Sequence, residues 1–401
     1  MHKHLIHSIL TIAVAAASLP ALLASSSDSN AATDQSGSDR PVTSQDIDAL
    51  KQEISDSSTS SVEGIFNYHH ETGDLNNRLD LLRYGGQVNY RVQGGTVLYV
   101  RGTGTSFLTT GRVLDEQGFN LTGGIRTSLS DAVDLQFEGG GSRFSNGGTT
   151  VNAMGTVRYK IEGGSELHFT GSRTNVEESL LSAAGVQPGT GPFANQIVGE
   201  VMDNRFVGGG VLKITHWLDL FGEGGGGQRT GQHIESNAFR VADGGAGVNV
   251  VSAPPDSQVS LLRLSYNMDY LAFDKNLLGY GGASLLGPGG LPVAVIGGDG
   301  VSPLATPGNP GLGGYFSPPD FLSHVGRVEV QGKASPGVEY HLSGFAGYQD
   351  FTGATNHKAA GVFGSVTLRL NDRFSLPITY VLDNFGPFVQ QTLFVRLTVK
   401  L

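Results

Sequence analysis

The stretch TLFVRLTVKL, residues Thr392–Leu401, decides the fold of this chain. Its side chains alternate strictly between two faces. One face carries Leu393, Val395, Leu397, Val399 and Leu401, and the other carries Thr392, Phe394, Arg396, Thr398 and Lys400. A period of two residues is typical of a β-strand with apolar surroundings on one side and water on the other.

The same alternation recurs from Val62 to the end of the chain in about 16 segments, separated by Gly, Pro, Asn, Asp and Ser. No helical period of comparable strength competes with it, so the sequence predicts an all-β fold. The predicted strands are 62–72, 82–93, 95–107, 119–130, 132–146, 150–161, 164–179, 200–216, 218–231, 236–253, 257–274, 321–335, 337–352, 357–371, 373–386 and 389–401.

The lengths of the connections predict how these strands are arranged. Tight turns follow mostly even-numbered segments and longer loops follow odd-numbered ones, the two longest being Leu180–Gly199 and Lys275–Asp320. An even number of strands with short turns at one end and long loops at the other is typical of a transmembrane, antiparallel, up-and-down barrel of the bacterial outer membrane. Both chain ends then lie on the periplasmic side.

A soluble β-sandwich or a solenoid is the alternative. It is disfavoured because an apolar face recurs in nearly every segment opposite a polar one, as lipid outside and water inside require. The last strand also resembles a barrel-insertion signal, although such signals usually end on an aromatic residue and this one ends on Leu401.

Composition excludes several classes of protein. The chain has 401 residues, 60 of them Gly, and no Cys, which excludes disulfide scaffolds, thiolate metal sites, cysteine nucleophiles and a lipid-modified N-terminal Cys. The formal net charge is −10, which argues against a nucleic-acid partner. Abundant glycine suits a strongly tilted barrel, because small residues allow close approach of backbones.

The first 61 residues precede the predicted barrel. A basic start and an apolar run from Ile9 to Ala24 predict a cleaved signal peptide over residues 1–24. Cleavage after Ala31 or Ala32 is an alternative site, and a membrane anchor is an alternative that the shortness of the run disfavours. Residues 25–61, rich in Ser and Asp, predict a flexible linker.

One short amphipathic helix is predicted inside that linker, over Thr43–Ile54.

No catalytic motif is present, and no cofactor is predicted. The run Gly224–Gly227, followed by Gln228 and Arg229, resembles a phosphate loop only in composition and is interpreted as a flexible strand. Three of the eleven histidines lie in the predicted signal peptide and the others are scattered, which favours solvated or lumenal histidines over a metal site.

Charged residues of both signs occupy the polar face of the predicted strands. They either brace the wall as paired charges or line a hydrated path for a polar solute, and both roles are compatible. The candidate pore-lining residues are Arg91, Arg126, Glu138, Arg158, Arg263, Asp269, Arg327, Glu329, Arg369 and Arg396.

Four stretches carry a resemblance that goes beyond architecture. They read LRYGGQVNY at Leu82–Tyr90, SRTNVEESLLSAAG at Ser172–Gly185, YNMDYLAFDKNLLGYGG at Tyr266–Gly282 and LGGYFSPPDFLS at Leu312–Ser323. Together they resemble the C-terminal domain of the bacterial cellulose synthase C-subunit family, over most of 62–401. The family-like loop residues are Ser179, Leu180, Leu181, Ser182, Gly185, Gly313, Gly314, Tyr315, Phe316, Ser317 and Pro318.

The resemblance implies a barrel that exports exopolysaccharide through the outer membrane. Members of that family usually carry tetratricopeptide repeats before the barrel, whereas only the short linker precedes it here. The implied partners are the polysaccharide in transit, outer-membrane lipid, a separate periplasmic repeat protein and an inner-membrane synthase.

The resulting hypothesis is a channel for a cellulose-like glucan that catalyses nothing. A general porin for small solutes is one alternative, in which the 275–320 loop folds inward. A non-conducting surface barrel that binds glycans is another.

Overall fold

The computed structural model describes residues 60–72, 79–92, 95–109, 115–145, 147–178, 180–185, 195–275, 285–286, 292–293, 315, 317–351, 354–385 and 388–401. All of them belong to the compact unit Thr33–Leu401. The predicted signal peptide, almost all of the predicted linker and the helix predicted at Thr43–Ile54 lie outside the described residues.

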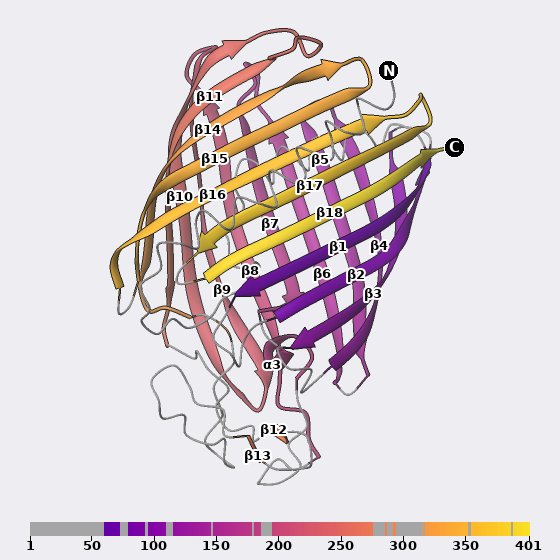
Figure 1. Ribbon diagram of the computed structural model, residues 1–401, viewed down its shortest axis with the longest axis vertical. Coiled ribbons are helices and arrows are strands. Elements are labelled where there is room, and N and C mark those ends of the chain that lie inside the picture. Colours follow the sequence, from indigo (N-terminus) through magenta and orange to yellow (C-terminus); the bar gives the residue numbers. More distant parts are fainter. Residues whose placement is uncertain are drawn as a thin grey trace. The chain divides into compact units, whose positions relative to one another are not determined.

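Sixteen long antiparallel strands form a closed barrel, in which each strand pairs with its neighbours along the chain and β1 pairs with β18 (Figure 1). The sequence therefore predicted the fold class and the number of strands correctly. The barrel strands are β1 Ser61–Thr72, β2 Leu79–Arg91, β3 Val97–Thr109, β4 Asp115–Ser130, β5 Val133–Phe144, β6 Thr149–Lys160, β7 Glu166–Asn175, β8 Gly199–Lys213, β9 Leu218–Gln232, β10 Ile234–Ser252, β11 Leu261–Phe273, β14 Phe321–Ser335, β15 Val338–Phe351, β16 Ala354–Arg369, β17 Phe374–Phe385 and β18 Phe388–Lys400.

Within the described residues, three short elements lie between the long strands. The helix α3 spans Leu180–Ala183, and the strands β12 (Leu285–Leu286) and β13 (Pro292–Val293) pair with each other. In the described part of the chain, no helix has the length and apolar character needed to cross a membrane.

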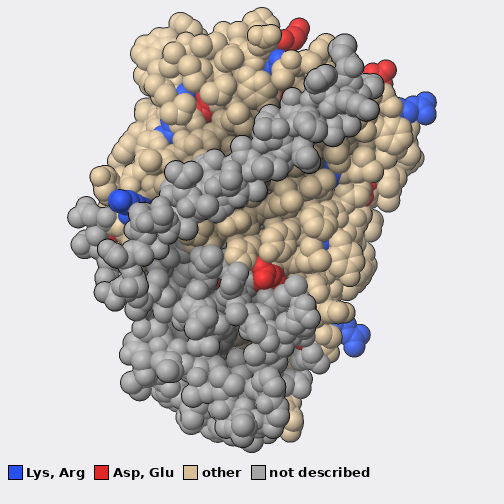
Figure 2. Space-filling model, viewed as in Figure 1, with Lys and Arg blue, Asp and Glu red and all other residues tan. Residues whose placement is uncertain are grey.

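The period of two places opposite kinds of side chain on the two faces of the wall. In β2, Val88 and Tyr90 are more than half exposed, whereas Gln87 and Asn89, which alternate with them, are buried. Figure 2 shows that the visible part of the outer surface carries few charged atoms. Apolar side chains outside and polar side chains inside are what a barrel needs to span a lipid bilayer, and the protein is an outer-membrane barrel.

The two ends of the barrel differ in their connections. We call the end where β1 begins and β18 ends the turn end, since its connections include the two-residue turns at 131–132 and 336–337. The opposite end, the loop end, carries the connections 176–198 and 274–320. Longer loops were predicted throughout this end, but His233 alone joins β9 to β10. Its φ of 55° lies in the left-handed region.

The structure moves several predicted strand ends by up to four residues, and one of these corrections bears on the interior of the barrel. The seventh segment was predicted to run from 164 to 179, but β7 ends at Asn175. The chain then leaves the sheet and enters the barrel, where Val176 and Glu178 are fully buried.

Candidate functional site

The wall of the lumen brings together charged and aromatic side chains from neighbouring strands. The ten candidate residues all lie at inward-facing positions of their strands. Arg126, Arg158, Arg327 and Glu329 are buried, Glu138, Arg263, Asp269 and Arg396 are half-buried, and Arg91 and Arg369 are exposed near the turn end.

Tyr99 illustrates how this wall is built. Its inward-facing ring crosses the neighbouring β4, and its hydroxyl donates a hydrogen bond of 2.7 Å to Glu138 on β5. The position that it crosses is Gly124, where a Cβ would collide with the tyrosine ring. Arg126 stacks on the same ring at 4.6 Å. The glycine is therefore what lets two strands exchange a polar contact across a third.

A second contact of this kind lies on the other side of the barrel. Arg263 on β11 reaches over β10 and donates a hydrogen bond of 2.5 Å to Asp219 on β9. It passes over Gly247, where a Cβ would collide with the guanidinium. Glycines at inward positions thus explain part of the unusual composition of the chain.

Ion pairs continue this pattern around the interior. Most of these pairs join side chains on directly neighbouring strands, and one contact, His168–Glu223, spans the strand between them. The pairs include Arg158–Glu166 at 3.3 Å, Lys160–Asp134 at 2.7 Å, Arg369–Glu339 at 3.1 Å and Arg396–Glu63 at 3.6 Å. The imidazoles of His168 and His341 contact the carboxylates of Glu223 at 2.6 Å and Glu329 at 3.1 Å.

The loop end is organised differently, because a segment of the chain lies inside the barrel there. We call residues 176–178 and 180–185 the inserted segment. Ala183 and Ala184 pack against Leu81, Phe107 and Phe144, which belong to β2, β3 and β5. The inserted segment therefore contacts one side of the wall through these two alanines.

Its other contacts reach the opposite side of the wall. Val176 and Leu181 belong to a buried cluster that includes Val207 on β8, Phe239 on β10 and Leu271 on β11. Because the inserted segment touches both sides, it lies across the lumen at the loop end. Figure 1 shows α3 at the end opposite the C-terminus.

Gly185 closes the inserted segment. Its φ of 73° lies in the left-handed region, and a Cβ there would lie 2.6 Å from the side chain of Ile197. Its backbone N–H donates a hydrogen bond of 3.1 Å to the carbonyl of Leu181. Only glycine fits this turn without strain, which explains why the motif ends on this residue.

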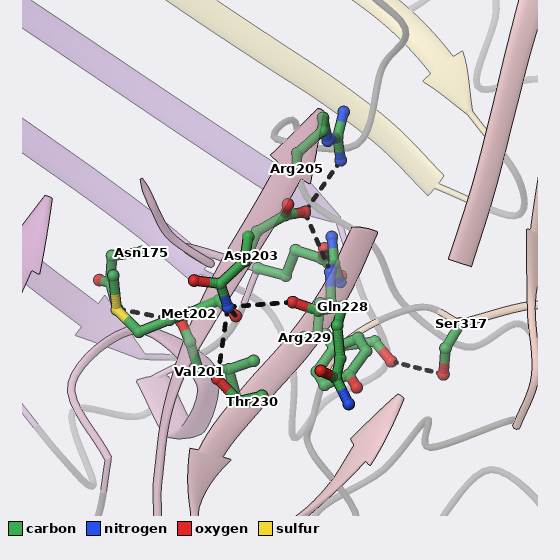
Figure 3. A network of polar contacts seen from close by, with 12 residues as sticks. Asn175, Val201, Met202, Asp203, Arg205, Gln228, Arg229, Thr230 and Ser317 are labelled. Atoms are coloured by element: carbon green, nitrogen blue, oxygen red, sulfur yellow. Dashed lines mark hydrogen bonds and ion pairs between the residues drawn. The ribbon is translucent and has the colours of Figure 1, made fainter. Parts of the chain in front are cut away.

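Arg229, near the loop end of β9, holds the inserted segment in place (Figure 3). The side chain is fully buried. Its Nη1 donates a hydrogen bond of 2.8 Å to Glu178, and its Nε donates a longer one of 3.4 Å to Asp203 on β8. Arg205 also donates to this Asp203 carboxylate, at 2.9 Å. Two arginines thus share two carboxylates inside the barrel.

The family-like motif at Leu312–Ser323 contacts the same arginine as the motif at Ser172–Gly185. The ring of Tyr315 lies 4.5 Å from the Arg229 guanidinium and 6.1 Å from the ring of Phe273. Ser317 is fully buried, and the carbonyl of Pro318 accepts a hydrogen bond of 2.9 Å from the backbone of Phe273. Burial raises the pKa of the Tyr315 hydroxyl, so it stays protonated at neutral pH.

A further ion pair anchors the inserted segment to the other side of the wall. Glu177 pairs with Arg83 on β2. Glu177 and Glu178 are adjacent, so consecutive carboxylates bind arginines on strands that lie far apart around the barrel.

Several family-like residues have no described side chain. Ser179, Gly313, Gly314 and Phe316 lie outside the described residues, and only the backbone of Leu180 is described. Leu181 and Ser182 are fully buried in the inserted segment.

Sequence reasoning missed the arginine at the centre of this arrangement. It placed Arg229 correctly on a strand but gave it no role, and it named neither Glu178 nor Asp203 as a site residue. The signal that could have found them was the pair of consecutive glutamates inside a motif that was already singled out. Across the described part of the chain, no cluster of three or more His, Asp or Glu side chains is placed to hold a metal ion.

Comparison with known proteins supports the resemblance seen in the motifs. Residues 115–290 match the model of a family described as the C-terminus of cellulose synthase operon protein C. The match contains the inserted segment and Arg229 and ends before Tyr315. No curated protein matches the chain.

Solved structures share the barrel fold at low sequence identity. A protein described as a bacterial polysaccharide outer membrane secretin has a TM-score of 0.57 and 9% identity, over 85% of this chain and 98% of that chain. CdiB from Acinetobacter baumannii has a TM-score of 0.41 and 8% identity, over 84% of this chain and 60% of that chain. The first of these likenesses supports the fold class.

Proposed function

We propose that this protein is an outer-membrane channel that passes an exopolysaccharide, a cellulose-like β-linked glucan, to the cell surface. The observation that carries the proposal is the family match over 115–290, which covers the strands from β4 to β11 and the inserted segment between them. In this proposal a separate repeat protein and an inner-membrane synthase deliver the chain. The barrel needs no cofactor and catalyses no reaction.

The polar wall supports transit of an uncharged, hydroxyl-rich chain. Its charges are largely engaged with one another, as in the pairs Arg263–Asp219 and Arg158–Glu166, so each offers hydrogen bonds without presenting a strong isolated charge. A glucan exchanges such bonds directly or through water as it advances. Synthesis at the inner membrane drives the movement.

The inserted segment has to shift for the polysaccharide to pass, because it lies across the lumen at the loop end. Its contacts are an ion pair and an apolar cluster on each side, which is a smaller attachment than the continuous pairing that holds the wall strands. We propose that this segment and the Tyr315 region move together, since both contact Arg229.

The porin alternative predicted from the sequence has the 275–320 loop as the constriction, and most of that loop lies outside the described residues. The inserted segment fits the same alternative as a fixed constriction for small solutes. A fixed constriction leaves a constant conductance, whereas a displaceable segment gives openings that depend on its attachment. The two functions therefore differ in a measurable property.

Single-channel recording in a planar bilayer tests the proposal, with the refolded protein and cello-oligosaccharides of increasing length. We expect stepwise openings that the oligosaccharides block more strongly as they lengthen, because a longer chain contacts more of the wall. A conductance indifferent to them favours the porin. A silent barrel, shown folded by heat-shifted gel mobility, favours the non-conducting surface barrel.

A deletion strain gives the second test. Loss of surface polysaccharide is the expected result, while normal polysaccharide delivery with impaired uptake of small solutes would contradict export.

A further inference from the structure

On the outer face of the barrel, the positively charged side chains of the described strands lie only toward the loop end. Most Lys and Arg side chains of the described strands point inward. The outward-facing ones are Arg143, Arg173, Arg240 and Lys358, and all are exposed and lie nearer the loop end of their strands than the turn end. The outward positions of the described strands below them, toward the turn end, carry no Lys or Arg.

Two of these cations belong to one continuous polar patch. Arg173, Asn204 and Gln228 lie directly opposite one another across β7, β8 and β9, and the next strand brings Arg240 to the following outward position. At about 4.8 Å between strands, the patch is roughly 15 Å wide. We call Arg173, Asn204, Gln228, Thr230 and Arg240 the outer patch.

Hydrogen bonds between neighbouring strands hold the side chains of this patch in place. Arg173 Nη1 donates a hydrogen bond of 2.6 Å to the side-chain oxygen of Asn204. The Asn204 amide donates in turn to the carbonyl of Gln228 at 3.1 Å and to the Thr230 hydroxyl at 3.4 Å. The guanidinium of Arg173 is therefore held at the surface, with only one of its donor groups used in this contact.

The surroundings indicate what the patch faces. Phe206 and Phe169 are about half exposed or more, and both lie on the same outer face, nearer the turn end than the patch. Such apolar rings sit against acyl chains, and cations one step further out sit at the headgroup layer. The acidic neighbours on this side are Asp274, whose backbone N–H donates to the carbonyl of Ala238, and Glu235, which pairs with Lys275. Because Lys275 balances Glu235, the two arginines face one further carboxylate and the patch is positive.

We propose that the outer patch binds the phosphate groups of an anionic glycolipid in the outer leaflet of the membrane. Arg173 and Arg240 supply the charge-assisted hydrogen bonds, since guanidinium groups match phosphate geometry. Asn204 and Gln228 between them supply neutral polar groups for the sugar that carries the phosphates. The site fixes one lipid to one sector of the wall, at β7 to β10.

Native mass spectrometry of the purified full-length protein tests this, with bisphosphorylated lipid A, the same lipid without phosphates and inorganic phosphate as probes. We expect the phosphorylated lipid to bind and the other two probes to bind far more weakly. Arg173→Gln with Arg240→Gln should reduce lipid binding about thirtyfold, and each single change about fivefold.

Arg373→Gln provides the matched control, because Arg373 is also exposed but lies in the turn between β16 and β17 at the other end. It should bind lipid as the unchanged protein does. Equal binding of the dephosphorylated lipid or of inorganic phosphate would overturn the proposal, as would unchanged binding by the double variant. If the double variant does not fold, lipid binding by the two single variants tests the proposal. None of these substitutions should change channel activity.

Discussion

The two halves of the lumen use the same strand pattern to build different interiors. In the turn half, inward charges pair across strands without a covering segment, and some of them keep contact with solvent: the Arg369 side chain is 46% exposed and Glu339 is 21% exposed. Others, such as Arg158 and Glu166, are buried within the wall. In the loop half, Arg229 is fully buried and its partner Glu178 is 1% exposed. The inserted segment makes this difference, because it brings its own apolar residues and carboxylates into the barrel.

The comparison shows that an alternating strand defines a polar inner face but does not determine whether water reaches it. Where the lumen is open to solvent, an ion pair is worth little and can be exchanged for contacts with a passing solute. Where the chain folds back, the same residue types become part of a second core and depend on their partners. The predictions below test this contrast, in order of expected effect.

Arg229→Ala should have the largest effect. The substitution removes the cation that lies between the buried carboxylates of Glu178 and Asp203. We expect this to destabilise the inserted position of the segment by about 3–5 kcal/mol. We expect more frequent and longer channel openings in bilayer recordings and faster proteolytic cleavage within 176–185. The barrel itself should keep its heat-shifted gel mobility, since the strand pairing is untouched.

Arg229→Lys separates charge from geometry, because lysine keeps the charge but loses the planar group that binds two carboxylates and stacks on Tyr315. Its openings should fall between those of the unchanged protein and Arg229→Ala. Equal behaviour of all three proteins would mean that the arginine does not hold the inserted segment.

Gly124→Leu should have an intermediate effect in the turn half. A side chain there collides with the Tyr99 ring and separates its hydroxyl from Glu138, at a cost of about 1–3 kcal/mol. We expect a lower resistance to unfolding by urea, with the conductance altered only if the ring moves into the path. Gly163→Ala, in the turn between β6 and β7, is not a suitable control because its φ is 87°.

Gly139→Ala is a better control for this prediction, because a Cβ at that position meets its nearest neighbour at 3.9 Å. It should leave stability to urea close to that of the unchanged protein. A loss as large as that of Gly124→Leu would show that flexibility of the strand, not passage of Tyr99, is what glycine provides.

Arg369→Gln should have the smallest effect. Its pair with Glu339 is exposed at the turn end, so its removal should change the free energy of unfolding by about 1 kcal/mol or less. Urea unfolding at low and high salt measures this, and the difference should shrink as salt screens the pair. A loss comparable to that of Arg229→Ala would remove the distinction between the two halves.

The wall of the barrel could be predicted from the sequence because its signal is local. Alternation within a segment such as Leu393–Leu401 requires no knowledge of any distant residue, and all sixteen predicted segments became strands. The inward placement of residues such as Arg126 and Arg327 followed from the same parity. Only the ends of segments were displaced, where a neighbouring turn or loop decides the boundary.

The interior of the loop half could not be predicted in this way. Arg229 binds Glu178, 51 positions earlier, and stacks on Tyr315, 86 positions later, and neither relation leaves a periodic trace. The segment predicted as a strand through residue 179 ended at Asn175, since burial of Val176 and Glu178 inside the barrel outweighed their fit to a strand. A motif pointed to the region, but only the fold shows which partners it meets.

The seam between β1 and β18 has a consequence for how the protein is made. Its pairing runs from Ser61 with Lys400 to Thr72 with Val389, so the first strand of the barrel cannot complete its pairing until the last strand is present. Until then the growing sheet has two unpaired edges, each of which invites pairing with another chain. Closure over such a long sequence separation is slow. The nascent chain therefore needs protection throughout its passage to the membrane, and the final dozen residues end that need in a single step.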